Sequence, residues 1–269
     1  MLPTASPSGS KRRSRVSVRR INWFSTYHVH HRVTQHFRKG RAFLSGDAAH
    51  IHSPAGGQGM NTGIGDAINL AWKLAAVVAG RAPESLLDSY EAERIGFARR
   101  LVASTDRAFT FATSPGRLAA FVRMHIAPIV IPNAFKLEAV RRFAFRTVSQ
   151  TAISYRGSRL SRGSAGRVQG GDRLPWVQTD SSDNFAPLRA ISWQVHVYGA
   201  AKPALTAWCE RQRVPLHVFD WRSEYGAAGL ARDALYLLRP DTYVALAEPS
   251  GAPGALDRYL ADLGIRATS

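Results

Sequence analysis

Apolar positions recur at spacings of three and four along residues 58–80, and this period predicts a helix with one buried face. The residues of that predicted apolar face are Met60, Ile64, Ala67, Ala71, Leu74 and Val78. Gly80 is expected to end this helix and Pro83 to open the next one. The apolar side of the second helix is predicted to be Leu86, Leu87, Tyr90 and Ile95. The pattern therefore predicts two helices joined by a short turn.

The segments on either side of these helices carry shorter signals. Residues 23–33 are rich in aromatic and β-branched residues, and residues 42–45 form a short apolar run, so both are predicted to be strands. Residues 117–125 and 135–148 have helical character. Pro128 and Pro132 are expected to break the path between these two helices, because proline lacks the backbone N–H that a helix interior needs.

A change of composition divides the chain. Residues 155–171 are dominated by Gly, Ser and Arg, and we place a domain boundary there. The elements predicted beyond it are strands at 193–198 and 216–221, a helix at 203–212, a hairpin of 234–238 and 243–246, and a helix at 255–263. The predicted fold class is α/β. We expect a basic disordered segment at 1–20, a first domain at 21–156 and a second domain at 172–269.

The chain is strongly basic, with 36 Lys and Arg residues against 19 Asp and Glu residues and a net charge of +17. Ten of these bases and none of the acids fall in residues 1–46. Such an excess favours contact with phosphate backbones or anionic surfaces, but it is also typical of a solvated tail and Arg-rich helix faces. No recognised nucleic-acid module accompanies it, so nucleic acid is not an expected partner.

Other counts narrow the class of protein. Hydrophobic residues make up 45% of the chain, which excludes wholesale disorder. No apolar run reaches the roughly 18 residues needed to span a bilayer, so we expect no membrane partner. The single cysteine, Cys209, cannot close an intrachain disulfide, and residues 1–20 lack the apolar core of a secretory signal. We therefore expect a cytoplasmic protein.

Residues 40–74 combine the features of a ligand site. A short strand delivers Asp47 at its carboxyl end, where ligands of α/β folds bind, and a glycine-rich loop then leads into a helix. The backbone N–H groups of residues 57–60 have no acceptor within that helix and favour negative charge. Asp47 could instead only cap the loop, and residue types alone leave both interpretations open.

The same stretch resembles the second FAD-binding motif of the flavin-dependent aromatic hydroxylases, the family of para-hydroxybenzoate hydroxylase and phenol hydroxylase. The matching elements are Gly46-Asp47-Ala48-Ala49-His50, Pro54, Gly56-Gly57-Gln58-Gly59-Met60-Asn61, and Asp66-Ala67 through Asn69-Leu70-Ala71-Trp72-Lys73-Leu74. In the next predicted helix, Tyr90-Glu91 and Glu93-Arg94 are also similar to the family's pattern.

The resemblance implies an FAD-dependent monooxygenase that hydroxylates an aromatic, phenolic substrate with NAD(P)H and O₂. The cofactor-binding residues that it implies are Gly46, Asp47, Pro54, Gly57, Gln58, Gly59, Met60 and Asn61. Asp47 would hold the ribityl and ribose side of FAD, and Pro54 would lie against the isoalloxazine ring near the carbon that reacts with O₂. The amides of residues 59–61 would face the N1–C2 carbonyl edge, where a helix N-terminus stabilises the anion of reduced flavin.

No metal is required by this chemistry, and no metal site is expected. His28 and His30 share one face of a predicted strand, but the nearest following carboxylate in the sequence is Asp47. The implied catalytic residues are not identified by the resemblance.

The second half of the chain is similar to another feature of the family. The order of strands and helices from residue 190 onward resembles the thioredoxin-like C-terminal domain of the phenol-hydroxylase-like members. This chain lacks a Cys-x-x-Cys pair, because Cys209 is its only cysteine. We therefore expect a packing role, or contacts within a homodimer, rather than a redox role.

The sequence also departs from the family. It contains neither the Gly-x-Gly-x-x-Gly turn that binds the ADP half of FAD nor the central Asp-Gly motif, and the resemblance begins near residue 21. We therefore expect the C-terminal half of such an enzyme, from a truncated or mis-started gene, with residues 1–20 foreign to the fold. The alternative is a non-catalytic interaction or dimerisation remnant that binds anionic partners through Arg-rich faces.

Overall fold

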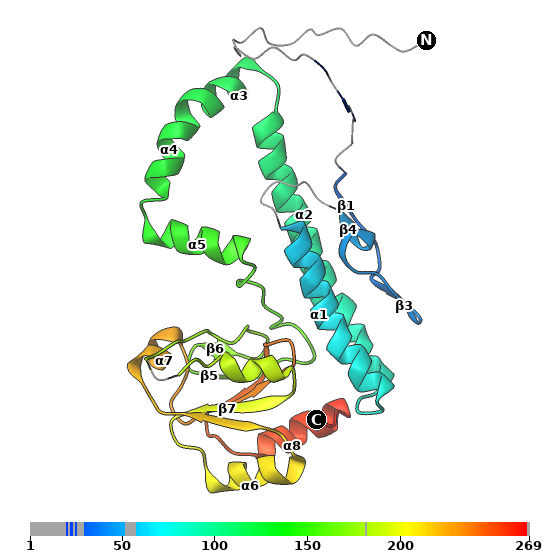
Figure 1. Ribbon diagram of the computed structural model, residues 1–269, viewed down its shortest axis with the longest axis vertical. Coiled ribbons are helices and arrows are strands. Elements are labelled where there is room, and N and C mark those ends of the chain that lie inside the picture. The colour runs from blue at the N-terminus through cyan, green and yellow to red at the C-terminus, as the bar shows by residue number, and fades with distance from the viewer. Residues whose placement is uncertain are drawn as a thin grey trace.

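A computed structural model describes residue 20, residues 22–23, residue 25, and residues 30–51, 58–180 and 182–267. Two long helices lie side by side, an arch of shorter helices follows the upper end of the longer one, and a sheet domain lies beside their lower part (Figure 1). The expected disordered segment at 1–20 falls almost entirely outside the described residues, as do Pro54 and Gly57. The fold is α/β, as the sequence predicts.

Four two-residue strands pack beside the long helices. They are β1 (Arg32–Val33), β2 (Arg38–Lys39), β3 (Ala42–Phe43) and β4 (His50–Ile51). β1 pairs antiparallel with β4, and β2 pairs antiparallel with β3. Of the strand predicted at 23–33, residues 23, 25 and 30–33 are described, and of these only Arg32–Val33 form a strand. The strand predicted at 42–45 begins where expected. A 3₁₀ turn (Gly46–Ala48) follows β3 and delivers Asp47.

The long helices are α1 (Gly59–Val78) and α2 (Asp88–Thr113), joined through a 3₁₀ turn (Glu84–Leu87). The limits of α1 agree with the prediction, but its predicted buried face is wrong. Met60 is 75% exposed and Val78 is 86% exposed. The buried residues of α1 are instead Thr62, Asp66, Asn69, Trp72, Lys73 and Ala76. Most of this face is polar, and hydrogen bonds to α2 and to the sheet domain make its burial favourable.

The arch contains α3 (Arg117–Phe121), a π-helical turn (Val122–Ile126), α4 (Ala127–Ala134) and α5 (Glu138–Val148). The break predicted at Pro128 and Pro132 is wrong, since both lie within α4. Pro128 sits in the first turn of α4, where a backbone N–H is not needed. Large apolar side chains of the arch are at least 40% exposed, namely Leu118, Phe121, Met124, Ile126, Ile129, Val130, Ile131, Phe135, Leu137, Phe143, Phe145 and Val148.

A membrane-spanning helix would need both length and apolar composition. Within the described part of the chain, no helix meets both conditions by itself. The bent pair formed by 117–134 and 138–148 meets them only when its two members are taken together.

The sheet domain has six strands in the order β6-β5-β10-β9-β7-β8. These strands are β5 (Arg162–Ala165), β6 (Val168–Gln169), β7 (Gln194–Tyr198), β8 (Leu216–Phe219), β9 (Leu235–Leu238) and β10 (Val244–Glu248). β7 is parallel to β8 and β5 is parallel to β10, while the other neighbours are antiparallel. The sheet thus includes residues 162–165 and 168–169, which lie within the segment 155–171 predicted as the domain boundary and before the second domain expected at 172–269.

Helices cover both faces of this sheet. α6 (Pro203–Gln212) and α8 (Gly254–Leu263) lie together on one face, and α7 (Ser223–Ala228) packs on the other (Figure 1). The core on the α6 and α8 side also contains Trp72 and Ala76 of α1. Trp72 of α1 meets Trp193 edge to face, with ring centroids 5.5 Å apart. One hydrophobic core therefore joins the helical part to the sheet domain.

Candidate functional site

The Gly46–Ala48 turn presents the carboxylate that the sequence singled out. Gly46 has a φ of +57°, a conformation that glycine adopts at little cost, and it lets the chain turn sharply after β3. Asp47 follows it and is exposed. An exposed carboxylate on a rigid turn can accept hydrogen bonds from the hydroxyl groups of a ligand.

The start of α1 lies directly against this turn. Gln58 occupies the N-cap position and is buried, while Gly59, Met60 and Asn61 form the first turn. A Cβ atom added to Gly63 would lie 3.3 Å from the Cα of Gly46, so little space remains between the turn and the helix. The structure therefore brings together Gly46, Asp47 and the free amides at the start of a 20-residue helix.

A buried set of hydrogen bonds joins these two segments, and the sequence analysis assigned it no role. Asp66 of α1 accepts hydrogen bonds from the Gly46 N–H (3.0 Å) and from Nε of Arg94 (2.6 Å), and it lies 2.8 Å from Nε2 of His50. Burial works to raise the pKa of Asp66, but His50, Arg94 and the Gly46 amide outweigh it and lower that pKa. The only signal in the sequence was that Asp66 and Arg94 both fall within the matched family pattern.

A second buried group of charges lies farther along α1, and we call Lys73, Glu93, Arg239 and Asp241 the interdomain ion cluster. Arg239 binds Glu93 through Nη1 (2.7 Å) and Nη2 (2.9 Å), and it binds Asp241 through Nε (2.9 Å) and Nη2 (2.6 Å). Lys73 donates to Glu93 at 2.8 Å. Burial lowers the pKa of Lys73 to about 8, although Glu93 opposes this shift. The cluster is electrically balanced and links both long helices to the β9–β10 turn.

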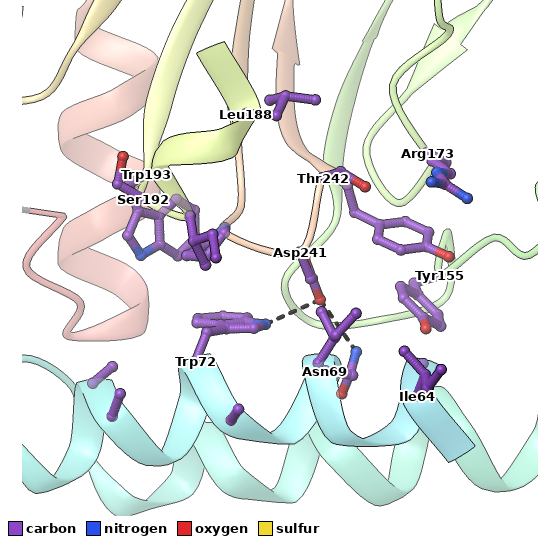
Figure 2. A pocket seen from close by; sticks show the side chains of 18 of the residues that line it. Ile64, Asn69, Trp72, Tyr155, Arg173, Leu188, Ser192, Trp193, Asp241 and Thr242 are labelled. Carbon is purple, nitrogen blue, oxygen red and sulfur yellow. Dashed lines mark hydrogen bonds between the residues drawn. The ribbon is translucent and has the colours of Figure 1, made fainter. Parts of the chain in front are cut away.

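A cavity of about 1020 Å³ lies between α1 and the sheet domain. It runs along α1 from Asn61 to Ala76, and Trp193 and Tyr243 line its other wall. Asp241 accepts hydrogen bonds from Trp72 Nε1 (3.0 Å) and Asn69 Nδ2 (3.4 Å) at its floor (Figure 2). The cavity starts at Asn61, one of the residues that the resemblance assigned to the flavin.

The described part of the chain contains no candidate metal-binding site. No group of three or more His, Cys, Asp or Glu side chains there has a geometry that could hold a metal ion. His28, one of the two histidines noted in the sequence, lies outside the described residues.

A family model and curated relatives match the chain. Residues 11–105 match the FAD binding domain, so this match starts earlier than the resemblance expected from residue 21. A flavin-dependent monooxygenase of Mycobacteroides abscessus is 36% identical over 247 residues, which is 89% of this chain and 44% of the relative. The pentachlorophenol 4-monooxygenase of Sphingobium chlorophenolicum is 49% identical over 83 residues, 31% of this chain and 15% of that protein.

Solved structures agree with these relatives. The anhydrotetracycline hydroxylase OxyS from Streptomyces rimosus superposes with a TM-score of 0.66 at 29% identity, covering 87% of this chain and 46% of that chain. The rebeccamycin biosynthetic enzyme RebC, solved with reduced flavin, gives a TM-score of 0.63 at 29% identity, covering 85% of this chain and 46% of that chain. The chain thus spans less than half of each of these proteins. The resemblance seen in the sequence is confirmed: the chain is similar to flavin-dependent aromatic monooxygenases over less than half of their length.

Proposed function

We propose that this chain supplies the part of an FAD-dependent aromatic monooxygenase that holds the ribityl chain and the pyrimidine edge of the flavin. The observation that carries the proposal is the contact of the Asp47 turn with α1, where Gly46 packs against Gly63 and donates its N–H to Asp66 just after the first turn of the helix. The residues present fit that part of FAD, because an exposed carboxylate and amides that have no acceptor within α1 lie on adjoining segments. The ADP half would need a glycine-rich turn that this sequence does not contain.

The proposed activity of the whole protein is hydroxylation of an aromatic, phenolic substrate, with NAD(P)H and O₂ as co-substrates. When bound, reduced FAD activates O₂ for transfer to the ring. The residues of this chain have binding roles. Asp47 accepts hydrogen bonds from ribityl hydroxyls, and the amides of residues 59–61 together with the dipole of α1 stabilise negative charge at the pyrimidine edge. Pro54 is proposed to lie against the ring.

FAD titration of the full chain, followed by flavin fluorescence, tests this proposal. Asp47→Ala should weaken FAD binding by roughly 10-fold or more, the usual cost of a lost hydrogen bond to a charged group. Asp180→Ala is the matched control, because Asp180 is an exposed aspartate of the sheet domain. Equal affinity in Asp47→Ala and wild type would remove the assignment of Asp47.

The alternative function is a non-catalytic module that binds anionic partners. It is favoured by the exposed arginines of α5, Arg141, Arg142 and Arg146, which lie among exposed apolar side chains. Under this alternative, the purified chain would not bind FAD but would bind heparin, with an affinity that falls as the salt concentration rises.

For the sheet domain, we infer a thioredoxin-like module without redox activity. The order β7-α6-β8-α7-β9-β10-α8, with β7 parallel to β8 and a final antiparallel pair, supports this inference. Cys209 lies in α6 and is buried. A packing role suits it better than thiol exchange.

The thiol of Cys209 is expected to react slowly. Burial raises its pKa to about 11, so very little thiolate is present at neutral pH. Labelling of the native chain with a thiol-specific disulfide reagent should be at least about 100-fold slower than labelling in denaturant. Rapid labelling of the native chain would contradict the packing role.

A further inference from the structure

Two segments of the candidate flavin site are held by one buried ion pair. Asp66 contacts the turn side, because its Oδ2 accepts the Gly46 N–H at 3.0 Å and lies 2.8 Å from Nε2 of His50 in β4. Arg94 of α2 contacts the helix side, because its Nη2 donates to the Thr62 carbonyl at 3.1 Å. Asp66 and Arg94 join each other at 2.6 Å. A continuous path of hydrogen bonds therefore runs from the Asp47 turn to the first turns of α1.

The helix side is fixed further by Thr62 and Gln150. Thr62 Oγ1 donates to the Gln58 carbonyl at 2.9 Å, and Gln150 Nε2 donates to that hydroxyl at 2.7 Å. Gln58 is the N-cap of α1, so these contacts set the position of the residue at which the free amides begin. Arg94 also donates to the Tyr155 hydroxyl at 3.0 Å, which fixes the guanidinium from a third direction.

Burial makes this arrangement rigid. Asp66 and Thr62 are completely buried, and Arg94 is 1% exposed. A Cβ atom on Gly65 would lie 3.2 Å from Nη2 of Arg94, so the guanidinium fills the space left by that glycine. A buried ion pair in which each nitrogen of Arg94 and each oxygen of Asp66 has a partner has few alternative arrangements, because each one would leave a charge without a partner.

We propose that Asp66 and Arg94 are positioning residues that set the distance between Asp47 and the amides at the start of α1. With their contacts to Gly46, His50 and Thr62, they form what we call the Asp66 brace. Neither of them belongs to the residues assigned to the flavin, and both act through backbone groups of the two binding segments. The positioning role of the brace rests on the proposed FAD binding. That the brace holds the two segments together does not depend on FAD.

Hydrogen exchange of the full chain without FAD tests the brace directly. Asp66→Asn keeps the shape of the side chain but removes its charge. Exchange in residues 46–51 and 58–62 should become roughly 10-fold faster or more, beyond any acceleration shared by the whole chain. Glu93→Gln is the matched control, since it removes another buried carboxylate that also contacts α1 but not the brace. Equal acceleration of all segments in Asp66→Asn would overturn the proposal.

A second variant and a measurement on wild type test the proposal even if Asp66→Asn does not fold. Arg94→Lys keeps the positive charge but loses the planar fork that reaches Asp66, Thr62 and Tyr155, and it should loosen the same two segments. In wild type, the amides of Gly46 and Thr62 should open together with one common opening constant. Separate openings of these amides would also overturn the proposal.

Measurements of FAD binding and of the flavin reduction potential test the brace and the proposed function separately. If wild type binds FAD, Asp66→Asn should weaken binding and shift the reduction potential of the bound flavin, whereas Glu93→Gln should leave that potential unchanged. An unchanged potential in Asp66→Asn would overturn the positioning role. If wild type binds no FAD, the proposed function fails for this chain, and the exchange experiment alone decides whether the brace exists.

Discussion

Replacing Arg239 by Met is expected to lower the free energy of unfolding by about 3–5 kcal/mol, because two buried carboxylates lose the guanidinium that binds them both. Arg239 is completely buried and makes two hydrogen bonds each to Glu93 and Asp241. Lys73 would remain as the only cation of the interdomain ion cluster. Of the two acids, it donates a hydrogen bond only to Glu93. Denaturant unfolding followed by circular dichroism measures the effect.

Arg142→Met is the control for this prediction. Arg142 pairs with Glu138 on the surface of α5, where both side chains are more than 60% exposed, so its loss should cost less than about 1 kcal/mol. A similar small loss in Arg239→Met would contradict the importance of the cluster. The double variant Arg239→Met with Glu93→Gln should lose less than the sum of the single losses, because the residues share one network.

Acid should reduce the difference between wild type and Arg239→Met. Burial works to raise the pKa of Glu93, but Arg239 and Lys73 outweigh it and hold that pKa well below its ordinary value of 4.5. A lowered pKa in the folded state contributes stability above pH 4.5, and this contribution is lost as the pH falls through the lowered value. The two unfolding free energies should therefore approach each other at low pH.

The helix α1 illustrates what periodicity can and cannot predict. Spacings of three and four gave its limits, since any amphipathic helix has that period. The pattern assigned the apolar stripe to the interior, whereas Asp66, Asn69 and Lys73 are buried and Ile64 is 50% exposed. Polar residues can be buried when their partners are in place, but those partners come from positions as distant as Asp241. A local pattern contains no information about them.

The sheet domain was predicted more closely in its core than at its edge. The limits of α6 agree with the prediction, and β7, β9 and β10 lie within two residues of it, because buried apolar runs and the turn at Arg239–Thr242 are local signals. β5 and β6 were missed because they are short and mostly Gly, Ser, Arg and Gln, with only Ala165 and Val168 as apolar residues. β5 is a strand because it pairs with β10, and β6 because it pairs with β5. Gly163 of β5 adopts a φ of +71°, where an added Cβ atom would collide with the Ala247 carbonyl.

The candidate site was also predicted only in part. Gly46, Asp47 and the start of α1 were singled out from a contiguous motif, and the structure brings them together. Their common support was not assigned, because Arg94 is 28 residues from Asp66 in the sequence. Packing of α2 against α1 creates that contact, so it depends on tertiary structure.

Trp193→Ala is expected to lower the free energy of unfolding by about 3–5 kcal/mol, the usual cost of truncating a large buried aromatic residue. Trp193 is 6% exposed and packs edge to face against Trp72 of α1 and against Tyr259 of α8. Because one core contains residues of α1 and of the sheet domain, the whole described chain should still unfold in a single transition. Circular dichroism reports the helices, and tryptophan fluorescence reports mainly the core.

Trp176→Ala separates this effect from a general loss of tryptophan. Trp176 is 60% exposed, so its truncation should change the unfolding free energy by less than about 1 kcal/mol. If Trp193→Ala left the helical transition unchanged and shifted only the sheet domain, the two parts would be independent folding units. The shared core and the interdomain ion cluster would then be contacts between domains that fold independently. In that case the circular dichroism and fluorescence transitions of Arg239→Met should also differ. Coincident shifts of both signals would instead mean that the flavin-site helix α1 depends on the sheet domain for its stability.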